Sequence, residues 1–558
     1  MAADPSPRAT RAQDPRFVAQ CSLAGLRDRL PLRWPAPPDL PPSPKRRYRS
    51  HYVYRGSQGL DDPAVVAALP LFDLLLRLID FGPLRAVLAR RLGWISARGW
   101  TPFDPVSLFL LLGWQIINGW NRSELLRKLA QSRYADYAQA FGFENEDYPT
   151  EGGLRYWLTA LGQHSATGEC ITIPGTDEQV EERAIQFLNE LIAQSIALLI
   201  EAQVFSPETL SQALVCPDGM LHQAASAMHC AYVRAACYQP TSPAQPRPCY
   251  ARERGKDGCA CDTPACTQVC RRATPRDPEA RYVYYAGHNR AAEPVTEPPA
   301  DGSRGKECYG YQSLPLQLAD RQRRFSAVLL DDFLPASTRA EVPAAALLLQ
   351  LQRFYPDLHL DTVAGDAGFG YEVFLRTVYA LSARRIIDQR RHTTDQDKAH
   401  WPLRQYDDHG RPLCPYGYAL TSNGFDRQRR RHKWFCGQAC RRGKEPTVQL
   451  ADTIYPPPEC PYQDRSRGLV RNIGLRFADG SSRLVRDAVV GSRTWKQLYH
   501  RGRNAVESRN ATREHWGLKR LPVYGTPRGK AYLFLSDVWD NLLTLARLVQ
   551  EATAATGH

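Results

Sequence analysis

The sequence has no apolar run long enough to cross a membrane. Its most hydrophobic stretch, VSLFLLLGWQII over residues 106–117, falls well short of the ~20 residues that a bilayer crossing needs, so we expect a buried helix there. The opening MAADPSPRATRAQDPRF has Pro, Asp and Arg where a signal peptide would need an apolar segment. We therefore expect a cytoplasmic protein without a membrane partner.

Acidic residues are in the minority. The 558 residues include 58 Asp and Glu against 72 Lys and Arg, which gives a net charge of +14. An excess of positive charge favours a polyanionic partner such as nucleic acid. In the cytoplasm the 15 cysteines are expected to be reduced thiols or metal ligands, not a disulfide framework. A chain of this length, 43% hydrophobic, predicts two or three domains.

The first half of the chain divides into a tail and a helical domain. Residues 1–60 are rich in Pro and Arg and predict a flexible tail. Over 61–205 apolar residues recur three and four apart, which predicts an all-helical domain with a DNA-binding role. Residues 118–143 indicate two short helices joined by a turn, either a DNA-contacting pair or part of a structural bundle. The outward basic residues expected on this pair are Arg122, Arg127, Lys128 and Arg133.

The pattern changes after residue 205, and residues 206–555 predict an α/β domain. Short apolar or alternating runs of strand length come first, and later ones alternate with helical patterns. This order predicts a mixed sheet covered by helices. The expected strands lie within 213–216, 281–287, 309–318, 325–333, 360–364 and 384–388, and the expected helices within 339–355 and 371–383.

Three acidic residues lie where such a domain binds its ligands. In LDTVAGDAGFG, Asp366 follows a buried strand and is surrounded by glycines that leave room for a substrate or a metal. Asp218 follows the first strand, and Glu507 lies on a basic amphipathic helix near the end of the chain. Ordinary turns at Asp366 and at Pro217-Asp218-Gly219 are the alternatives. Glu514 lies on the same helix face as Glu507 and competes as the third acid.

On these motifs, together with RNAVESRN and GKAYLFLSDVWDNLLTLARLVQ, the sequence resembles the DDE transposases of bacterial insertion sequences, whose catalytic domain has the RNase H-like fold. The resemblance covers about residues 212–550. It implies that Asp218, Asp366 and Glu507 form a catalytic triad holding two Mg²⁺, as hard oxygen ligands would. Arg503 matches the family pattern on that helix, whereas Tyr499 stands one residue too early and Glu514 replaces the usual Lys.

The resemblance also implies a reaction, partners and a location. The expected reaction cleaves the ends of a DNA element and joins its 3′ ends to target DNA, so double-stranded DNA is the expected partner. Synapsis of two ends implies a homodimer or a larger assembly, and the location would be the bacterial nucleoid. Two other functions fit the same pattern: a transposase-derived, zinc-containing DNA-binding protein that does not cut, and an RNase H-like nuclease without strand transfer.

Two cysteine-rich insertions interrupt the predicted catalytic domain, at about 237–280 and 389–470. Clusters this dense in a cytoplasmic chain predict structural Zn²⁺ held by thiolates, with buried free thiols as the alternative. In the first insertion the candidate ligands are Cys259, Cys261, Cys266 and Cys270. In the second they are Cys414, within a Cys-Pro-x-Gly knuckle, and Cys436, Cys440 and Cys460.

The second insertion also carries the basic run DRQRRRHKWF. Arginines interleaved with aromatic residues are typical of surfaces that bind phosphates and exposed bases, although a solvated loop has the same composition. The predicted DNA-binding residues are Arg429, Arg430, Arg431, Lys433 and Trp434, with Arg503 from the helix of Glu507.

Overall fold

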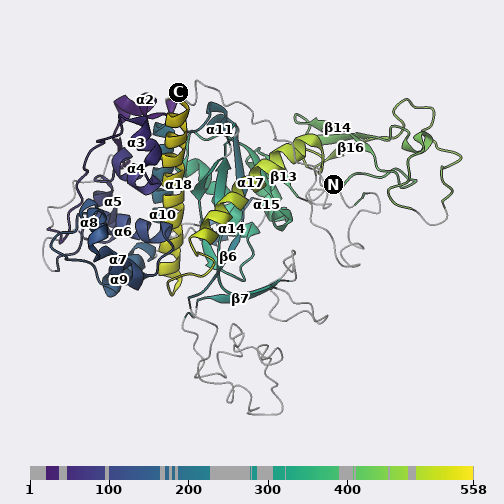
Figure 1. Ribbon diagram of the computed structural model, residues 1–558. Helices are drawn as coiled ribbons and strands as arrows, with labels where there is room; N and C mark the ends of the chain where they lie inside the picture. The colour runs from purple at the N-terminus through teal and green to yellow at the C-terminus, as the bar shows by residue number, and fades with distance from the viewer. Residues whose placement is uncertain are drawn as a thin grey trace, which may run out of the picture.

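The computed structural model shows a mixed α/β protein (Figure 1). A group of helices from the first part of the chain lies on one side, a sheet with its covering helices lies in the middle, and a small three-stranded sheet projects on the other side. No helix in the described part of the chain has both the length and the apolar character that a membrane span requires. The structure describes residues 20–36, 47–94, 100–163, 170–174, 179–181, 186–225, 277, 279–285, 306–320, 322–323, 325–388, 406–407, 410–449, 453–475 and 486–556.

The first part of the chain is mostly helical, but the prediction that it is all-helical is wrong, because residues 170–172 and 179–181 pair as two short strands. The apolar run 106–117 is helix α6 (Pro105–Ile117), almost wholly buried; Asp104 caps it by accepting from the Val106 amide. The apolar stretch 65–79 lies mostly in two helices, which Pro70 separates. The elements of this part are α2 (Leu23–Leu26), η1 (Arg27–Arg29), α3 (Pro63–Ala68), α4 (Leu71–Leu78), α5 (Leu84–Arg91), α7 (Arg122–Leu129), η2 (Ser132–Tyr134), α8 (Ala135–Ala140), α9 (Glu151–Gly162), α10 (Gln186–Glu201) and α11 (Pro207–Ser211), with the two-stranded sheet β3 (Cys170–Thr172) and β4 (Gln179–Glu181).

Part of the predicted flexible tail belongs to the core, so that prediction is wrong for residues 21–34. Strand β1 (Leu32–Arg33) pairs in parallel with β2 (Ile79–Asp80). The indole of Trp34 is fully buried, and its Nε1 donates to the side chain of Gln194 at 2.8 Å. A buried, hydrogen-bonded tryptophan fixes this segment against the helices.

The helix pair predicted over 118–143 is present as α7 and α8, but its basic residues are not all free to face outwards. Lys128 pairs with Glu124 at 3.8 Å, and its Nζ lies 4.5 Å from the ring centre of Trp120. Arg122 is half-buried, and burial lowers the pKa of its guanidinium. Arg127 and Arg133 remain exposed.

The central sheet has five strands in the order β10-β9-β5-β12-β13. Strands β5 (Ala213–Pro217), β12 (Leu360–Gly365) and β13 (Arg384–Ile387) are parallel neighbours. Strand β9 (Leu316–Ala319) runs antiparallel to both β5 and β10 (Ser326–Leu330). The prediction of a mixed sheet with helices is therefore confirmed.

Strands β5, β9 and β10 of the central sheet end at a bend, and the adjoining stretches of chain beyond the bend form a second sheet. Pro217 pairs with Leu316 in the central sheet, and Met220 pairs with Ser313 in the second, so the ladder keeps its register across the bend. Each of the runs predicted as one strand at 309–318 and 325–333 is thus two. The second sheet contains β6 (Met220–Gln223), β7 (Arg281–Tyr285), β8 (Lys306–Ser313) and β11 (Phe333–Pro335), with β8 paired to the other three.

Helices cover both faces of the central sheet. Alternate residues of a strand point to opposite faces: Leu214 and Cys216 of β5 pack under helix α17 (Arg493–His515), whereas Ala213 and Val215 join the main core on the other face. That face is covered by α14 (Glu341–Phe354) and α15 (Glu372–Ala380), both predicted from their apolar spacing.

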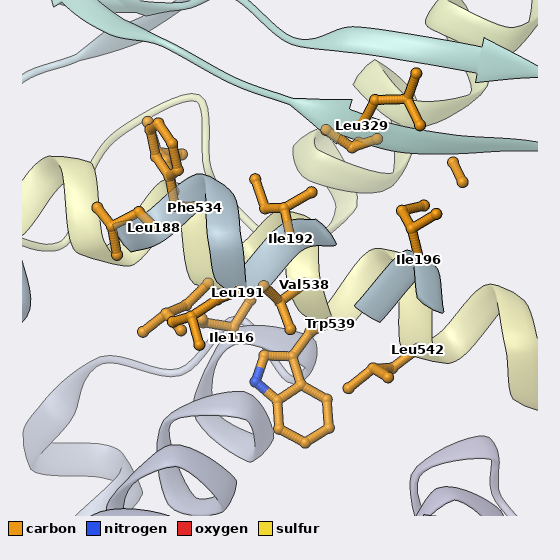
Figure 2. Close-up of a cluster of buried hydrophobic side chains, with 14 of the residues drawn as sticks. Ile116, Leu188, Leu191, Ile192, Ile196, Leu329, Phe534, Val538, Trp539 and Leu542 are labelled. Atoms are coloured by element: carbon orange, nitrogen blue, oxygen red, sulfur yellow. The ribbon is translucent and has the colours of Figure 1, made fainter. Parts of the chain in front are cut away.

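The last helix, α18 (Thr526–Thr556), links the sheet to the first helices. It contacts α3, α4, α6, α9 and α10 as well as β10. Figure 2 shows Phe534, Val538 and Trp539 of α18 in one cluster with Ile116 of α6 and apolar side chains of α10. At Gly113 of α6 a Cβ would lie 1.9 Å from the Trp539 ring, so only glycine allows this crossing.

Candidate active site

Asp366 lies at the carboxyl end of β12, as predicted. It caps the short helix η3 (Ala367–Phe369), because its Oδ1 accepts from the Gly368 amide at 2.8 Å. A Cβ on residue 368 would lie 2.9 Å from that oxygen, which explains the glycine. The Asp366 side chain remains 43% exposed. The turn therefore orients a carboxylate that stays open to solvent.

Asp218 lies at the bend between β5 and β6. Because the chain continues in the same direction and register on both sides, Pro217-Asp218-Gly219 does not form a reversing turn. The Asp218 amide donates to the Pro315 carbonyl on the neighbouring strand at 3.3 Å. Its side chain is only 10% exposed. Strands β5 and β12 are adjacent and parallel, which brings Asp218 close to Asp366.

Helix α17 supplies the third acid and lies unusually close to the sheet. At Gly502 a Cβ would be 2.4 Å from the Cys216 sulfur and 3.1 Å from the Cβ of Ala364. Glycine removes this clash and lets the helix contact β5 and β12 directly. The next residue, Arg503, is therefore held over the ends of these two strands.

The guanidinium of Arg503 lies between all three predicted acids. Its Nη1 is 3.3 Å from Asp218 Oδ1 and 3.9 Å from Asp366 Oδ2. Its Nη2 is 3.4 Å from Glu507 Oε1, one helical turn further along α17. Residues far apart in the sequence thus converge on one side chain.

Charge and burial oppose each other in this cluster. Burial, followed by the neighbouring charge of Asp366, raises the pKa of Asp218 to about 6. Arg503 and a 2.8 Å hydrogen bond from Asn510 Nδ2 act in the opposite direction. Burial alone would lower the pKa of Arg503, but the surrounding anions outweigh it and raise that pKa. Additional positive charge near Asp218 would therefore stabilise the ionised form of this carboxylate.

Glu507, not Glu514, lies with the other two acids. Glu514 pairs with Lys519 at 2.7 Å and is 46% exposed. Glu507 is 62% exposed and contacts Arg503, as Asp218 and Asp366 do. Of the two candidates for the third acid, Glu507 has the matching geometry.

No protein-family model, curated protein or solved structure matches this chain.

The residue types at this site are those that a divalent cation prefers. Three carboxylates offer the oxygen ligands that Mg²⁺ prefers, and the raised pKa of Asp218 indicates a buried carboxylate that additional positive charge would stabilise. In the described residues, however, no group of three or more His, Cys, Asp or Glu side chains is placed so that it could hold a metal ion. At the acid cluster, the guanidinium of Arg503 lies between the carboxylates.

Three residues of the site were not predicted. Asn510 holds Asp218 from the next turn of α17. Asp388 follows β13, and its amide donates to the Gly365 carbonyl at 3.0 Å. Burial, together with the charge of Asp388, raises the pKa of Tyr499 to about 12. The acid that ends the run RRIID was a usable signal for Asp388, because it follows a strand as Asp366 does.

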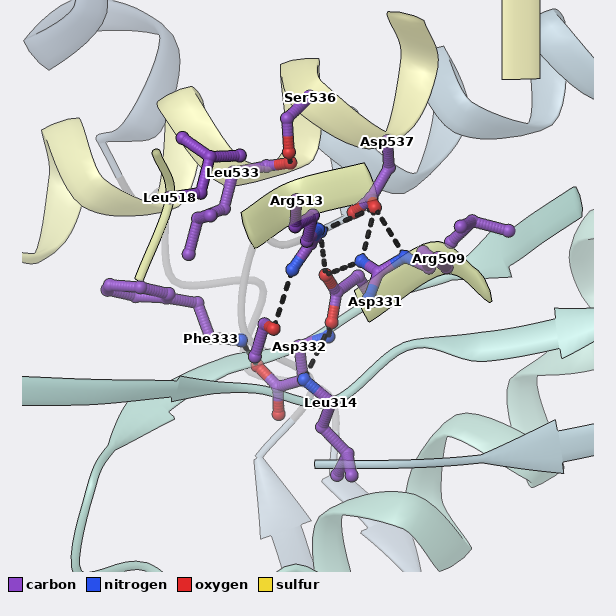
Figure 3. Close-up of polar contacts among 12 residues, drawn as sticks. Leu314, Asp331, Asp332, Phe333, Arg509, Arg513, Leu518, Leu533, Ser536 and Asp537 are labelled. Carbon is purple, nitrogen blue, oxygen red and sulfur yellow. Dashed lines mark hydrogen bonds and ion pairs between the residues drawn. The ribbon is translucent and has the colours of Figure 1, made fainter. Parts of the chain in front are cut away.

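A second face of α17 is held by a buried ionic network (Figure 3). Arg509 and Arg513 both pair with Asp331, at the bend between β10 and β11, and with Asp537 of α18. All four side chains are at most 2% exposed. The two arginines of α17 are thus tied by buried ion pairs to the β10–β11 bend and to α18, so the network restrains the rotation of the helix that carries Arg503 and Glu507.

The second insertion contains the three-stranded sheet β14 (Thr421–Asp426), β15 (Arg431–Phe435) and β16 (Val470–Gly474), with η4 (Ala439–Arg442). Cys414 and Cys436 are buried in its small core, and Cys440 packs beside them. Cys460 is partly exposed, and the Tyr416 hydroxyl donates to its neighbouring Glu459 carbonyl. The Zn²⁺ predicted at these thiols stays a prediction. Cys259, Cys261, Cys266 and Cys270 lie outside the described residues.

The basic run forms the β14–β15 hairpin, and its side chains have different surroundings. Trp434 is 5% exposed and packs beside His432, so the prediction that it stacks on DNA bases is wrong. Because alternate residues of a strand point to the same face, Trp434 and Cys436 both point into the small core of the insertion. Arg430 lies 3.7 Å from the ring centre of Tyr379. Lys433 and Arg431 both pair with Asp426.

Arg429 and its neighbour Arg427 are exposed at the tip of this hairpin. The hairpin is anchored to the main sheet, because His432 Nδ1 hydrogen-bonds the Arg486 carbonyl and Arg385 of β13 pairs with Asp487. The hairpin that carries the exposed arginines is thus fixed relative to the central sheet.

Proposed function

We propose that this chain cuts and joins DNA strands as a transposase of the DDE type, with Asp218, Asp366 and Glu507 as ligands of two Mg²⁺. One observation carries the proposal: three carboxylates from two adjacent parallel strands and a helix converge on one guanidinium. The mixed five-stranded sheet covered on both faces by helices is compatible with an RNase H-like fold.

The chain's own residues would have distinct roles. Asn510 and the strand bend hold the buried Asp218 in one orientation. Asp366 and Glu507 face solvent, where a phosphodiester backbone can approach. When bound, paired Mg²⁺ ions stabilise the attacking and leaving oxygens of a phosphoryl displacement. The exposed Arg429 and the net charge of +14 favour a DNA partner.

Mg²⁺-dependent nicking of a supercoiled plasmid carrying the element's ends tests the proposal. Asp366→Asn and Glu507→Gln should bind DNA normally but lower cleavage by orders of magnitude, because each removes one charged ligand. Glu514→Gln is the matched control on the same helix and should cleave at the parental rate.

The products also separate the alternatives. Cleavage without joined products indicates a nuclease. DNA binding without cleavage in the parental protein indicates the non-catalytic binder. Near-normal cleavage by both Asp366→Asn and Glu507→Gln overturns the assignment of the acids.

A further inference from the structure

Arg503 occupies the centre of the acid cluster. Its two terminal nitrogens lie within 3.9 Å of oxygens of Asp218, Asp366 and Glu507. These acids come from the β5–β6 bend, the end of β12 and helix α17. The guanidinium therefore links helix α17 to the β5–β6 bend and to the end of β12, and also contacts a carboxylate on its own helix.

The neighbouring carboxylates stabilise Arg503 in this position, and its partial exposure allows the side chain to move away from them. Carboxylates this close repel one another, and a positive charge between them relieves the repulsion. The Arg503 side chain is 26% exposed and lies beside the solvent-facing Glu507. Its long side chain can therefore turn outwards without unfolding helix α17.

We infer that Arg503 is an internal counter-ion of the acid cluster, which must leave the three carboxylates before a divalent cation binds there. The inference rests on the proposed function, because it takes these carboxylates as metal ligands. A guanidinium and a metal ion cannot share the same oxygens at close range, since like charges repel. Arg503 thus stabilises the metal-free site and lowers its affinity for metal.

Direct Mn²⁺ binding to the full-length, DNA-free protein tests the inference. Free Mn²⁺ is counted by electron paramagnetic resonance, and the melting temperature is measured with and without saturating Mg²⁺. Arg503→Gln removes the competing charge and should bind Mn²⁺ at least about tenfold more tightly. It should also melt below the parental protein without metal and recover with Mg²⁺. Arg503→Lys retains the charge and should bind close to the parental affinity.

The matched control is Arg493→Gln, which removes the same charge from the exposed first turn of α17. It lies 10 residues from Arg503, or about 15 Å along the helix. Equal Mn²⁺ affinity in Arg503→Gln and Arg493→Gln overturns the inference and leaves the proposed function intact. Mn²⁺ binding that Asp366→Asn does not weaken, in either the parental or the Arg503→Gln background, overturns the proposed metal site itself.

Discussion

Gly502 allows a direct test of how helix α17 is seated on the sheet. A Cβ at this position would lie 2.4 Å from the Cys216 sulfur, so the two atoms must separate by about 1 Å to reach ordinary contact. Alanine gains about 1 kcal/mol over glycine in a helix, whereas overpacking a close-packed site typically costs about 1–3 kcal/mol. We expect Gly502→Ala to lower the free energy of unfolding by up to about 2 kcal/mol, the difference between these two terms.

Removing the sulfur should rescue the substitution. In Cys216→Ala the nearest remaining atom to the new Cβ is that of Ala364, at 3.1 Å. Cys216→Ala alone should cost about 1 kcal/mol through lost packing. The double variant should then be more stable than the sum of the two single effects by at least about 1 kcal/mol.

Urea titration of the four proteins measures this coupling energy. Additivity within about 0.5 kcal/mol would refute the reasoning, because α17 would then move freely relative to β5. Gly152→Ala, at an exposed helical glycine where a Cβ meets only the Thr150 hydroxyl at 3.8 Å, is the control. It should not destabilise the protein.

Three further predictions concern pH, zinc and DNA. Burial lowers the pKa of His222 to about 3, so the folded state does not take up the proton that the unfolded state binds below pH ~6.5. Between pH 6.5 and 5 the free energy of unfolding of the parental protein should therefore fall by about 2 kcal/mol more than that of His222→Gln, as measured by urea titration. Protein purified without added metal should contain one or two Zn²⁺, and Cys436→Ser should lose about one equivalent; elemental analysis giving equal zinc in both proteins would remove Cys436 from the ligands. Arg429→Ala should flatten the salt dependence of DNA binding by about one unit of slope. Arg431→Ala should change the slope little, because Arg431 is already paired with Asp426. Equal slopes for the two variants, in filter binding at several salt concentrations, would contradict this.

Local patterns in the sequence predicted most elements of the sheet domain. The apolar run before Asp366 indicated β12, and the spacing over 371–383 indicated α15. The sequence could not show that β5 continues through Pro217-Asp218-Gly219, because those residue types usually reverse a chain. Register across the bend depends on pairing with β8 and β9, which are distant in sequence.

Side-chain surroundings were predicted less well than elements. Alternation in the strand RHKWF was a usable signal that Trp434 points the same way as His432, into the small core. Nothing local indicated that Arg503 would contact Asp218 and Asp366, because an arginine four residues before a glutamate on a helix is ordinarily a surface pair.

Helix α18 is synthesised long after some of the helices that it covers. Helices α3, α4 and α6, which it covers, are complete at Ile117, about 410 residues before Thr526. At ~5–20 residues per second, that interval is roughly 20 to 80 seconds. Throughout it, the apolar face around Ile116 and Phe109 lacks the cover it has in the folded chain. The nascent protein should therefore depend on chaperones until its last helix is made.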